Sequence, residues 1–125
     1  MTKSLGAAFL GSAFALVFSL CNADATTDYK VLHDFVSTDG SWPGAFVVDR
    51  AGNIIGTAEY GGANGAGTIF KLSPDGTFSV LHAFGGDDGR RPESLQYFQH
   101  SGRIVGSTVY GGRSACHHAG CGVLY

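Results

Sequence analysis

Alternating hydrophobic and polar positions run through the chain from about residue 29 and predict short β-strands. In "FSVLHAF" (residues 78–84) the alternation places Phe78, Val80, His82 and Phe84 on one face, which is the period of two that a pleated strand requires. Two hairpins are expected, one joining residues 45–49 to 54–58 and the other joining residues 68–72 to 77–84 through the turn "SPDG". Helical spacing is absent after the first 25 residues.

The strand pattern occurs twice along the sequence. Residues 29–62 match residues 78–112, at an offset of 49 up to Pro43 and Pro92 and of 50 from Gly52 and Gly102 onward. Unit one therefore spans about 29–77 and unit two about 78–125, where "GVLY" resumes the pattern of "GTIF" and leaves the second unit incomplete. Four strands in about 50 residues is the content of one propeller blade. We expect an all-β fold of antiparallel, propeller-blade-like sheet repeats.

The N-terminus reads as a secretory signal peptide that forms a helix before the repeats. Lys3 precedes an uncharged apolar run at residues 5–20, and Ala23 and Ala25 form a small-x-small cleavage site. The run has 16 residues, fewer than the ~20 that span a bilayer. An uncleaved anchor and lipid attachment at Cys21 are the alternatives, and Leu20 disfavours the second. We expect a signal peptide at 1–25, a repeat region at 26–125 without a membrane span, and a periplasmic, extracellular or cell-surface location.

Composition and charge narrow the partner classes. The chain of 125 residues has 20 glycines, 44% hydrophobic residues and only three prolines, which favours strands and tight turns over disorder. Its formal net charge of -2 argues against nucleic acid, because a nucleic-acid footprint needs a clustered cationic face. The expected partner is an unidentified protein or glycan.

The glycines of "GGANGAGTIF" (residues 61–70) do not form a cofactor motif. A phosphate loop needs a lysine and a following helix, and a calcium repeat needs an aspartate at a set place after its glycines. None of these features is present, so we expect the glycines to permit tight turns and close strand contacts. No cofactor is expected.

The segment "CHHAGC" offers four ligand-type side chains, from Cys116, His117, His118 and Cys121, which is enough to count for a zinc site. Adjacent histidines point apart, however, and the two separated ligand pairs of structural zinc sites are missing. In an exported chain, we expect a disulfide between Cys116 and Cys121 instead. We expect no metal site, and a small metal-binding module here is the alternative.

No catalytic residue is identified. His33 and His82 recur at equivalent positions, and we expect hydrogen-bonded, partly buried histidines rather than metal ligands. Turn chemistry accounts for four aspartates beside glycine or another aspartate, namely Asp39, Asp75, Asp87 and Asp88. Glycan hydrolysis needs two carboxylates across one cleft, and neither Glu59 nor Glu93 is repeated.

The motifs "VLHDF", "GNIIGTAEYGGANGAGTIFKLSPDGT" and "VLHAF" resemble the GloVer tandem-repeat family of exported bacterial proteins, built from many copies of a Gly-rich unit. The resemblance covers residues 29–125. It implies a repetitive, propeller-like β fold, export, and a cysteine-bracketed insert before the "GVLY" strand, but no reaction. The chain departs from the family pattern in having fewer than two full units and no C-terminal anchoring segment.

Three functions remain open. We expect an exported, non-catalytic binding or structural module, in which Trp42, Tyr60 and Tyr110 line the surface, although core packing also explains them. The alternatives are a propeller-type enzyme acting on polysaccharide and the metal-binding module at Cys116–Cys121. Because repeats bury their faces against neighbours and about three are usually needed, we expect a fragment of a longer array or self-association through exposed sheet faces.

Overall fold

The computed structural model describes residues 28–113 and 119–125, and this part of the chain contains six β-strands and no helix. The predicted all-β, antiparallel fold is confirmed. The expected signal-peptide helix and its cleavage site at Ala23 and Ala25 lie outside the described residues. The strands are β1 (Ser41–Val48), β2 (Ile54–Tyr60), β3 (Thr68–Leu72), β4 (Phe78–Ala83), β5 (Arg90–Phe98) and β6 (Arg103–Tyr110).

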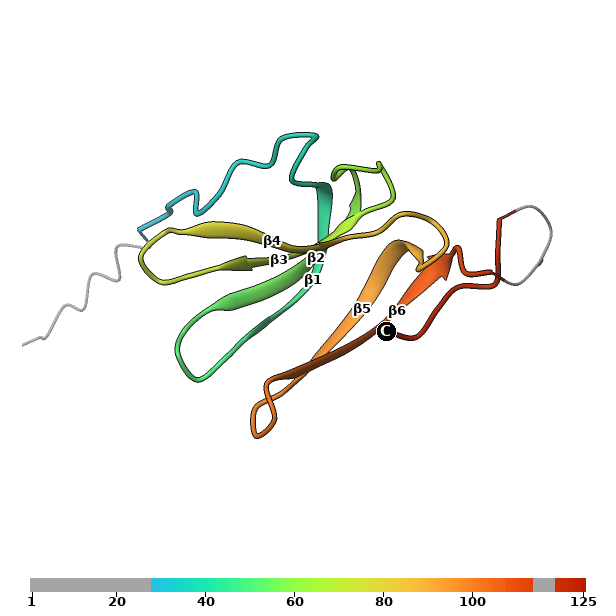
Figure 1. Cartoon of the computed structure of the whole chain (residues 1–125). Coiled ribbons are helices and arrows are strands. Elements are labelled where there is room, and N and C mark those ends of the chain that lie inside the picture. The colour runs from blue at the N-terminus through green and yellow to red at the C-terminus, as the bar shows by residue number, and fades with distance from the viewer. Residues whose placement is uncertain (1–27, 114–118) are drawn as a thin grey trace, which may run out of the picture.

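The strands form two antiparallel sheets, which do not close into a ring (Figure 1). The first sheet is a meander with the order β1-β2-β3-β4, and it contains both predicted hairpins. The second sheet pairs β5 with β6. Residues 122–125 lie along β6, where Tyr125 and Gly106 exchange two backbone hydrogen bonds of 3.0 Å and Leu124 bridges Ser107. The second sheet thus repeats the first three strands of the first sheet.

The strand registers show that the two sheets are equivalent position by position. Phe46 pairs with Gly56 in the first sheet, and Leu95 pairs with Gly106 in the second. The same correspondence continues to the end of each pair, through Val47↔Ile55 and Gln96↔Val105, and then Val48↔Ile54 and Tyr97↔Ile104. The residue inserted in the second copy therefore lies in the turn between β5 and β6.

The boundaries of the sheets do not coincide with the boundaries of the sequence copies. Strand β4 comes from the start of the second copy, yet it hydrogen-bonds to β3, which belongs to the first copy. The first sheet therefore combines three strands of one copy with one strand of the next. The segment of the first copy that matches β4, residues 29–34, is not part of any sheet in the structure.

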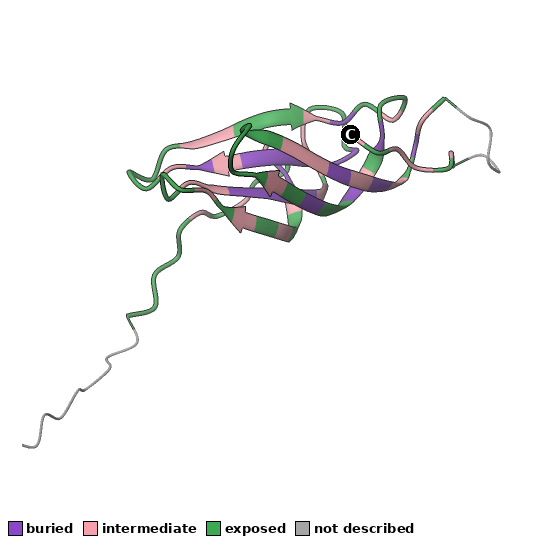
Figure 2. Ribbon diagram, turned by 90° about the horizontal axis from the view of Figure 1, so that it is seen from below, coloured by how far each residue is buried: buried purple, intermediate pink, exposed green. Residues whose placement is uncertain are grey.

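The core lies between the two sheets, where β5 packs against β1 and β2. Figure 2 shows the buried positions along the central parts of the strands, with the hairpin tips exposed. The buried cluster contains residues of both sheets and of the connections between them, namely Ile55, Ala66, Ile69, Phe84 and Leu95. Burying the isoleucine, leucine and phenylalanine side chains of this cluster contributes about 1.5 to 3 kcal/mol each, so the contact between the sheets supplies much of the stability.

The prediction that Phe78, Val80, His82 and Phe84 share one strand face is wrong. A β-bulge interrupts the pairing of β4 with β3, so that Val80 lies opposite Phe70 while His82 lies opposite Ile69. Because consecutive residues of β3 point to opposite faces, Val80 and His82 also lie on opposite faces. The extra residue of the bulge shifts the alternation, and only the partner strand reveals this shift.

The glycines of residues 61–70 shape the backbone, as predicted. Gly67 has a φ of 101°, and its amide donates to the carbonyl of Gly61 while its own carbonyl accepts from the amide of Phe84. A residue with a Cβ atom would be strained at that φ, whereas glycine is not. The loop thus brings Phe84 back toward the start of β3.

Candidate functional site

Polar and aromatic side chains gather in a hollow of about 250 Å³ at the junction between the two sheets, here called the junction hollow. It is lined by the ends of strands, at Tyr60, Arg90, Arg91 and Tyr110, and by Ala119. Strand register sets these positions, because Arg90 is the cross-strand partner of Tyr110, just as Ser41 is the partner of Tyr60. The repeat therefore brings two equivalent tyrosines to one site.

Backbone strain recurs beside this hollow. Trp42 has a φ of 58° and Arg91 a φ of 60°, and they are the only non-glycine residues with positive φ in the described part of the chain. They occupy equivalent positions of the two copies, each directly before a proline. Such residues cost on the order of 1 to 3 kcal/mol and persist where the surrounding structure holds them, often at ligand sites. The fold thus maintains a strained conformation at these two positions.

Tyr60 is held between a side chain of its own sheet and one of the next sheet. The ring of Trp42 meets it edge-on at 5.6 Å between centroids, and the Cζ atom of Arg91 lies 5.6 Å from its centroid, in cation–π range. Tyr60 remains 37% exposed, which leaves part of the ring open to a ligand. Core packing, the alternative explanation for Tyr60 and Trp42, does not describe them, because Trp42 is 70% exposed.

Arg91 is neutralised by its neighbours, whereas Arg90 is not. The Nε atom of Arg91 donates to Glu59 Oε2 at 2.8 Å, and this hydrogen bond raises the pKa of Arg91 above its ordinary value. Its Nη2 atom also lies 4.0 Å from Glu93 Oε1. Both glutamates singled out in the sequence thus approach one guanidinium. Arg90 is exposed and forms no ion pair with any described residue, so its charge is available to an anionic group.

The recurring histidines pair with the recurring aspartates, which sequence reasoning treated separately. His33 Nε2 lies 3.0 Å from Asp39 Oδ2, and His82 Nε2 lies 2.7 Å from Asp88 Oδ2. The other carboxylate oxygen accepts a backbone amide three residues earlier, from Val36 or from Gly85. The spacing of six residues in both copies was the signal that could have found these pairs. They close the loops that lead into β1 and β5.

The environment of Asp88 favours its charged form. Burial alone raises the pKa of this carboxyl, but the hydrogen bonds from the Gly85 amide and the His82 ring outweigh that effect and lower the pKa below its ordinary value. Asp75 accepts the Thr77 amide at 2.9 Å, which lowers its pKa and fits the predicted turn role. These carboxylates organise turns and lie outside the junction hollow.

The predicted disulfide is not decided by the structure, since Cys121 is described but Cys116, His117 and His118 are not. The disulfide and the zinc alternative both remain predictions. Within residues 28–113 and 119–125, no three side chains of histidine, cysteine, aspartate or glutamate gather as a metal site would require. The same residues include no helix of the length and apolarity that a membrane crossing requires.

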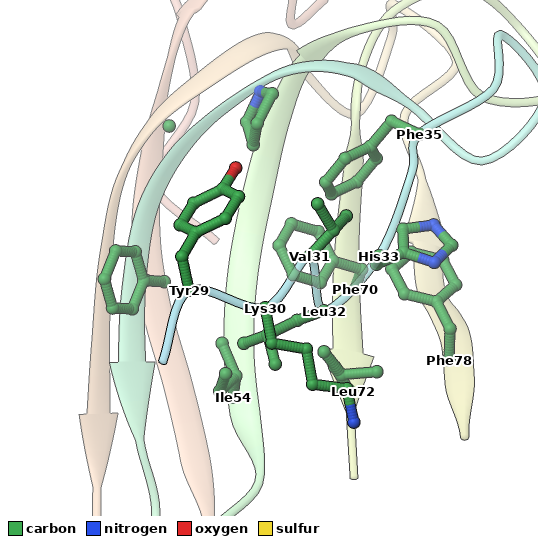
Figure 3. Close-up of a pocket in the computed structure, with 13 residues that line it drawn as sticks. Tyr29, Lys30, Val31, Leu32, His33, Phe35, Ile54, Phe70, Leu72 and Phe78 are labelled. Atoms are coloured by element: carbon green, nitrogen blue, oxygen red, sulfur yellow. The ribbon is translucent and has the colours of Figure 1, made fainter. Parts of the chain in front are cut away.

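A larger hollow, of about 400 Å³, lies between residues 29–35 and the first sheet (Figure 3). Its lining is mostly apolar and includes Leu32, Phe46, Phe70 and Phe78. Apart from Lys30, His33 and the hydroxyl of Tyr29, it offers no polar side chains. This hollow therefore lacks the polar groups that orient a small ligand and has the character of a packing surface.

Two equivalent antiparallel sheets that bury a shared core define a tandem β-repeat protein. The chain belongs to the Gloeobacter/Verrucomicrobia repeat family, whose model matches residues 1–125. This match confirms the family that the sequence motifs indicated. No curated protein and no solved structure matches the chain significantly.

Proposed function

We propose that this protein is an exported, non-catalytic β-repeat module that binds a glycan at the cell surface or in the extracellular space. The observation that carries the proposal is the junction hollow, where Tyr60, Tyr110 and the unpaired Arg90 converge. The location remains a proposal that rests on the N-terminal signal at residues 1–25.

The chemistry of the hollow fits a sugar that carries a carboxylate. Tyrosine presents a flat apolar face with a polar hydroxyl, which suits the faces and hydroxyl groups of a sugar ring. Arginine pairs with carboxylates in a bidentate geometry, and Arg90 has no described partner to compete for it. Arg91 instead holds Tyr60 in place through the Glu59 ion pair. We therefore propose an acidic glycan as the ligand.

Calorimetry with oligouronides, and with neutral oligosaccharides of the same linkage, tests this proposal. We expect saturable binding of the acidic series and no release of shorter products. Arg90→Gln should lower the affinity at least about tenfold, because hydrogen bonds to charged groups contribute about 1.5 to 3 kcal/mol. Arg103→Gln is the matched control, since it removes the same charge from an exposed arginine at the start of β6.

The outcomes separate the remaining functions. Equal glycan affinity of the Arg90→Gln and Arg103→Gln variants would show that the glycan does not bind at the junction hollow. Release of shorter sugars would instead support the polysaccharide-acting enzyme. N-terminal sequencing of the exported chain tests the location, and we expect Thr26 as its first residue, because cleavage should follow Ala25.

Self-association through exposed sheet faces is a second part of the proposal. The outer face of the first sheet exposes large apolar side chains, including Phe46 at 67% and Val48 at 53%. Contiguous apolar surface of this kind marks interaction sites. A concentration-dependent increase in the mass measured by light scattering is expected, and a constant mass of one chain would contradict it.

A further inference from the structure

We propose that residues 29–35 of one copy add to the second sheet of another copy as its fourth strand. The inference refines the proposed self-association and does not depend on glycan binding. It specifies which segment is donated, which edge receives it, and which faces meet.

The donated segment corresponds to a strand but lacks a partner strand. At the offset of 49, residues 29–34 match β4, which pairs with β3. Residues 29–35 have no regular structure, and none of their backbone groups hydrogen-bonds to another described residue. Tyr29, Val31 and Leu32 are exposed at 88%, 52% and 59%. An extended apolar segment with free backbone groups is suited to adding to a sheet edge.

The receiving edge is the counterpart of β3. Residues 122–125 pair with β6 on one side, just as β3 pairs with β2. On the other side β3 carries β4, whereas no strand of the described structure lies beside residues 122–125. The register follows when the residue pairs between β3 and β4 are applied to residues 122–125 of one copy and the donated segment of the other. Tyr125 then lies opposite Val31 of the second copy, and Leu124 lies opposite its His33.

The contact proposed between two copies has a counterpart inside one chain, where the first and second sheets pack against each other. Leu95, on the second sheet, is 8% exposed and shares the core cluster with Ile69 of the first sheet. Phe46 is the register equivalent of Leu95, and Leu124 is the equivalent of Ile69, but these two residues are 67% and 81% exposed. A second copy that places its Phe46 against Leu124 repeats the internal contact between copies.

Figure 3 shows how the donated segment is held before association. Residues 29–35 cross the strands that carry Ile54, Phe70 and Phe78 without joining them. The ring of His33 stacks on Phe78 at 3.7 Å between centroids, and Phe35 meets Phe70 edge-on at 5.1 Å. Phe84, the equivalent of Phe35, approaches Tyr125, the equivalent of Phe70, at 5.2 Å with the two rings tilted by 58°. The segment is thus held through the rings of His33 and Phe35, while its backbone groups form no hydrogen bond with another described residue.

The contact is heterologous, because one copy offers its first-sheet face and donated segment while the other offers its second sheet. A heterologous contact leaves one unused surface on each copy and can continue. This property gives a sharp test. Two variants that each lose a different half of the contact cannot associate alone, but together they can form one contact.

The test uses Phe46→Asp and Leu124→Asp variants of the exported chain, residues 26–125, measured by light scattering. Wild type should exceed the mass of one chain as concentration rises. Each variant alone should remain at one chain, and an equal mixture should reach the mass of two. Leu81→Asp, which charges an exposed leucine of β4, should associate like wild type. A mixture that stays at one chain overturns the proposal.

A second pair of variants tests strand addition itself. His33→Pro and His33→Ala both remove the imidazole ring, but only His33→Pro also removes the amide, which bonds to no described residue within the chain and lies opposite Leu124 in this register. The two variants should melt at similar temperatures as single chains, and only His33→Ala should still associate. Association of His33→Pro at the level of His33→Ala would leave self-association in place but overturn strand addition.

Hydrogen exchange on wild type gives an answer that needs no variant. The amides of residues 31–34, which lie opposite residues 123–125 in this register, should exchange more slowly at high protein concentration than at low concentration, because strand addition protects them. Equal exchange at concentrations where the mass doubles would show that the copies meet elsewhere, and would overturn the inference.

Discussion

Tyr125 differs by one hydroxyl group from its counterpart in the first copy, Phe70. Phe70 of the first copy packs over Gly56, and Tyr125 takes the same place over Gly106. The added hydroxyl donates to the backbone carbonyl of Ser94 at 2.8 Å. Burial of the ring raises the pKa of Tyr125 to about 12, from an ordinary value of 10.0. The neutral phenol is therefore favoured in the folded chain.

We expect Tyr125 to make the stability of the protein fall at alkaline pH. Its folded pKa is raised, so its contribution is complete below pH 10 and is lost as the pH rises toward about 12. Two pKa units correspond to at most about 2.7 kcal/mol, and to less here because water screens a half-buried ring. Denaturant unfolding of wild type and Tyr125→Phe at several pH values measures this difference.

The Tyr125→Phe variant retains the ring and resembles the first copy. Near neutral pH it should lose about 1 kcal/mol, the usual net contribution of one hydrogen bond. Above pH 10 the gap between variant and wild type should narrow. A gap that stays constant from pH 8 to about pH 12 would show that the phenol does not titrate as proposed.

At the level of elements, the close contact of neighbouring strands depends on glycine in β2. Gly56 lies opposite Phe70 of β3, and a Cβ atom built on Gly56 would come within 2.5 Å of the Phe70 ring. The equivalent Gly106 is covered by the ring of Tyr125. An aromatic ring thus occupies the space over a glycine in each sheet, and there is no room there for a side chain.

We expect Gly56→Ala to destabilise the protein by about 1 to 3 kcal/mol, the usual cost of overpacking. Gly85→Ala is the control, because its Cβ would meet no atom closer than 3.7 Å and its φ is not positive. Thermal melts of both variants measure the difference. Adding Phe70→Leu to Gly56→Ala should recover part of the loss; if it does not, a steric clash with the Phe70 ring is not the cause.

The sequence predicted those elements whose signals are local. The hairpin of β3 and β4 was predicted because "SPDG" encodes its turn without help from distant residues. The bulge in β4 was missed because it depends on pairing with β3. The junction hollow itself was not predicted: the sequence indicated Tyr60 and Tyr110 only as surface residues, and the place of Arg90 beside them depends on the folded arrangement of the strands. Positive φ at Arg91 has no sequence signal in a residue that is not glycine.

At the scale of the whole molecule, equivalent positions have different surroundings. Leu95 and Phe46 occupy the same place in the repeat, yet one is buried between the sheets and the other faces solvent. The contribution of an apolar side chain to the free energy of unfolding depends here on whether a neighbouring sheet covers that side chain. Stability is therefore concentrated at the contact between copies.

Substitutions at Leu95 and Phe46 measure how much the contact between the sheets contributes to stability. Leu95→Ala should destabilise the chain by about 2 to 5 kcal/mol, as expected for a buried leucine. Phe46→Ala, at a concentration where the chain is monomeric, should change stability by no more than about 0.5 kcal/mol. Denaturant unfolding of both variants measures the difference. Similar losses would contradict the exposed position of Phe46 in the single chain.

The phase difference between sheets and sequence copies affects how such a protein can gain or lose copies. The boundary between the two copies falls inside a sheet, between β3 and the β4 that completes it. A recombination event that removes or inserts one whole copy therefore always rejoins a third strand to a fourth strand of the same kind. The number of copies can drift during evolution without creating a new junction, while neither copy becomes a separate domain that melts by itself.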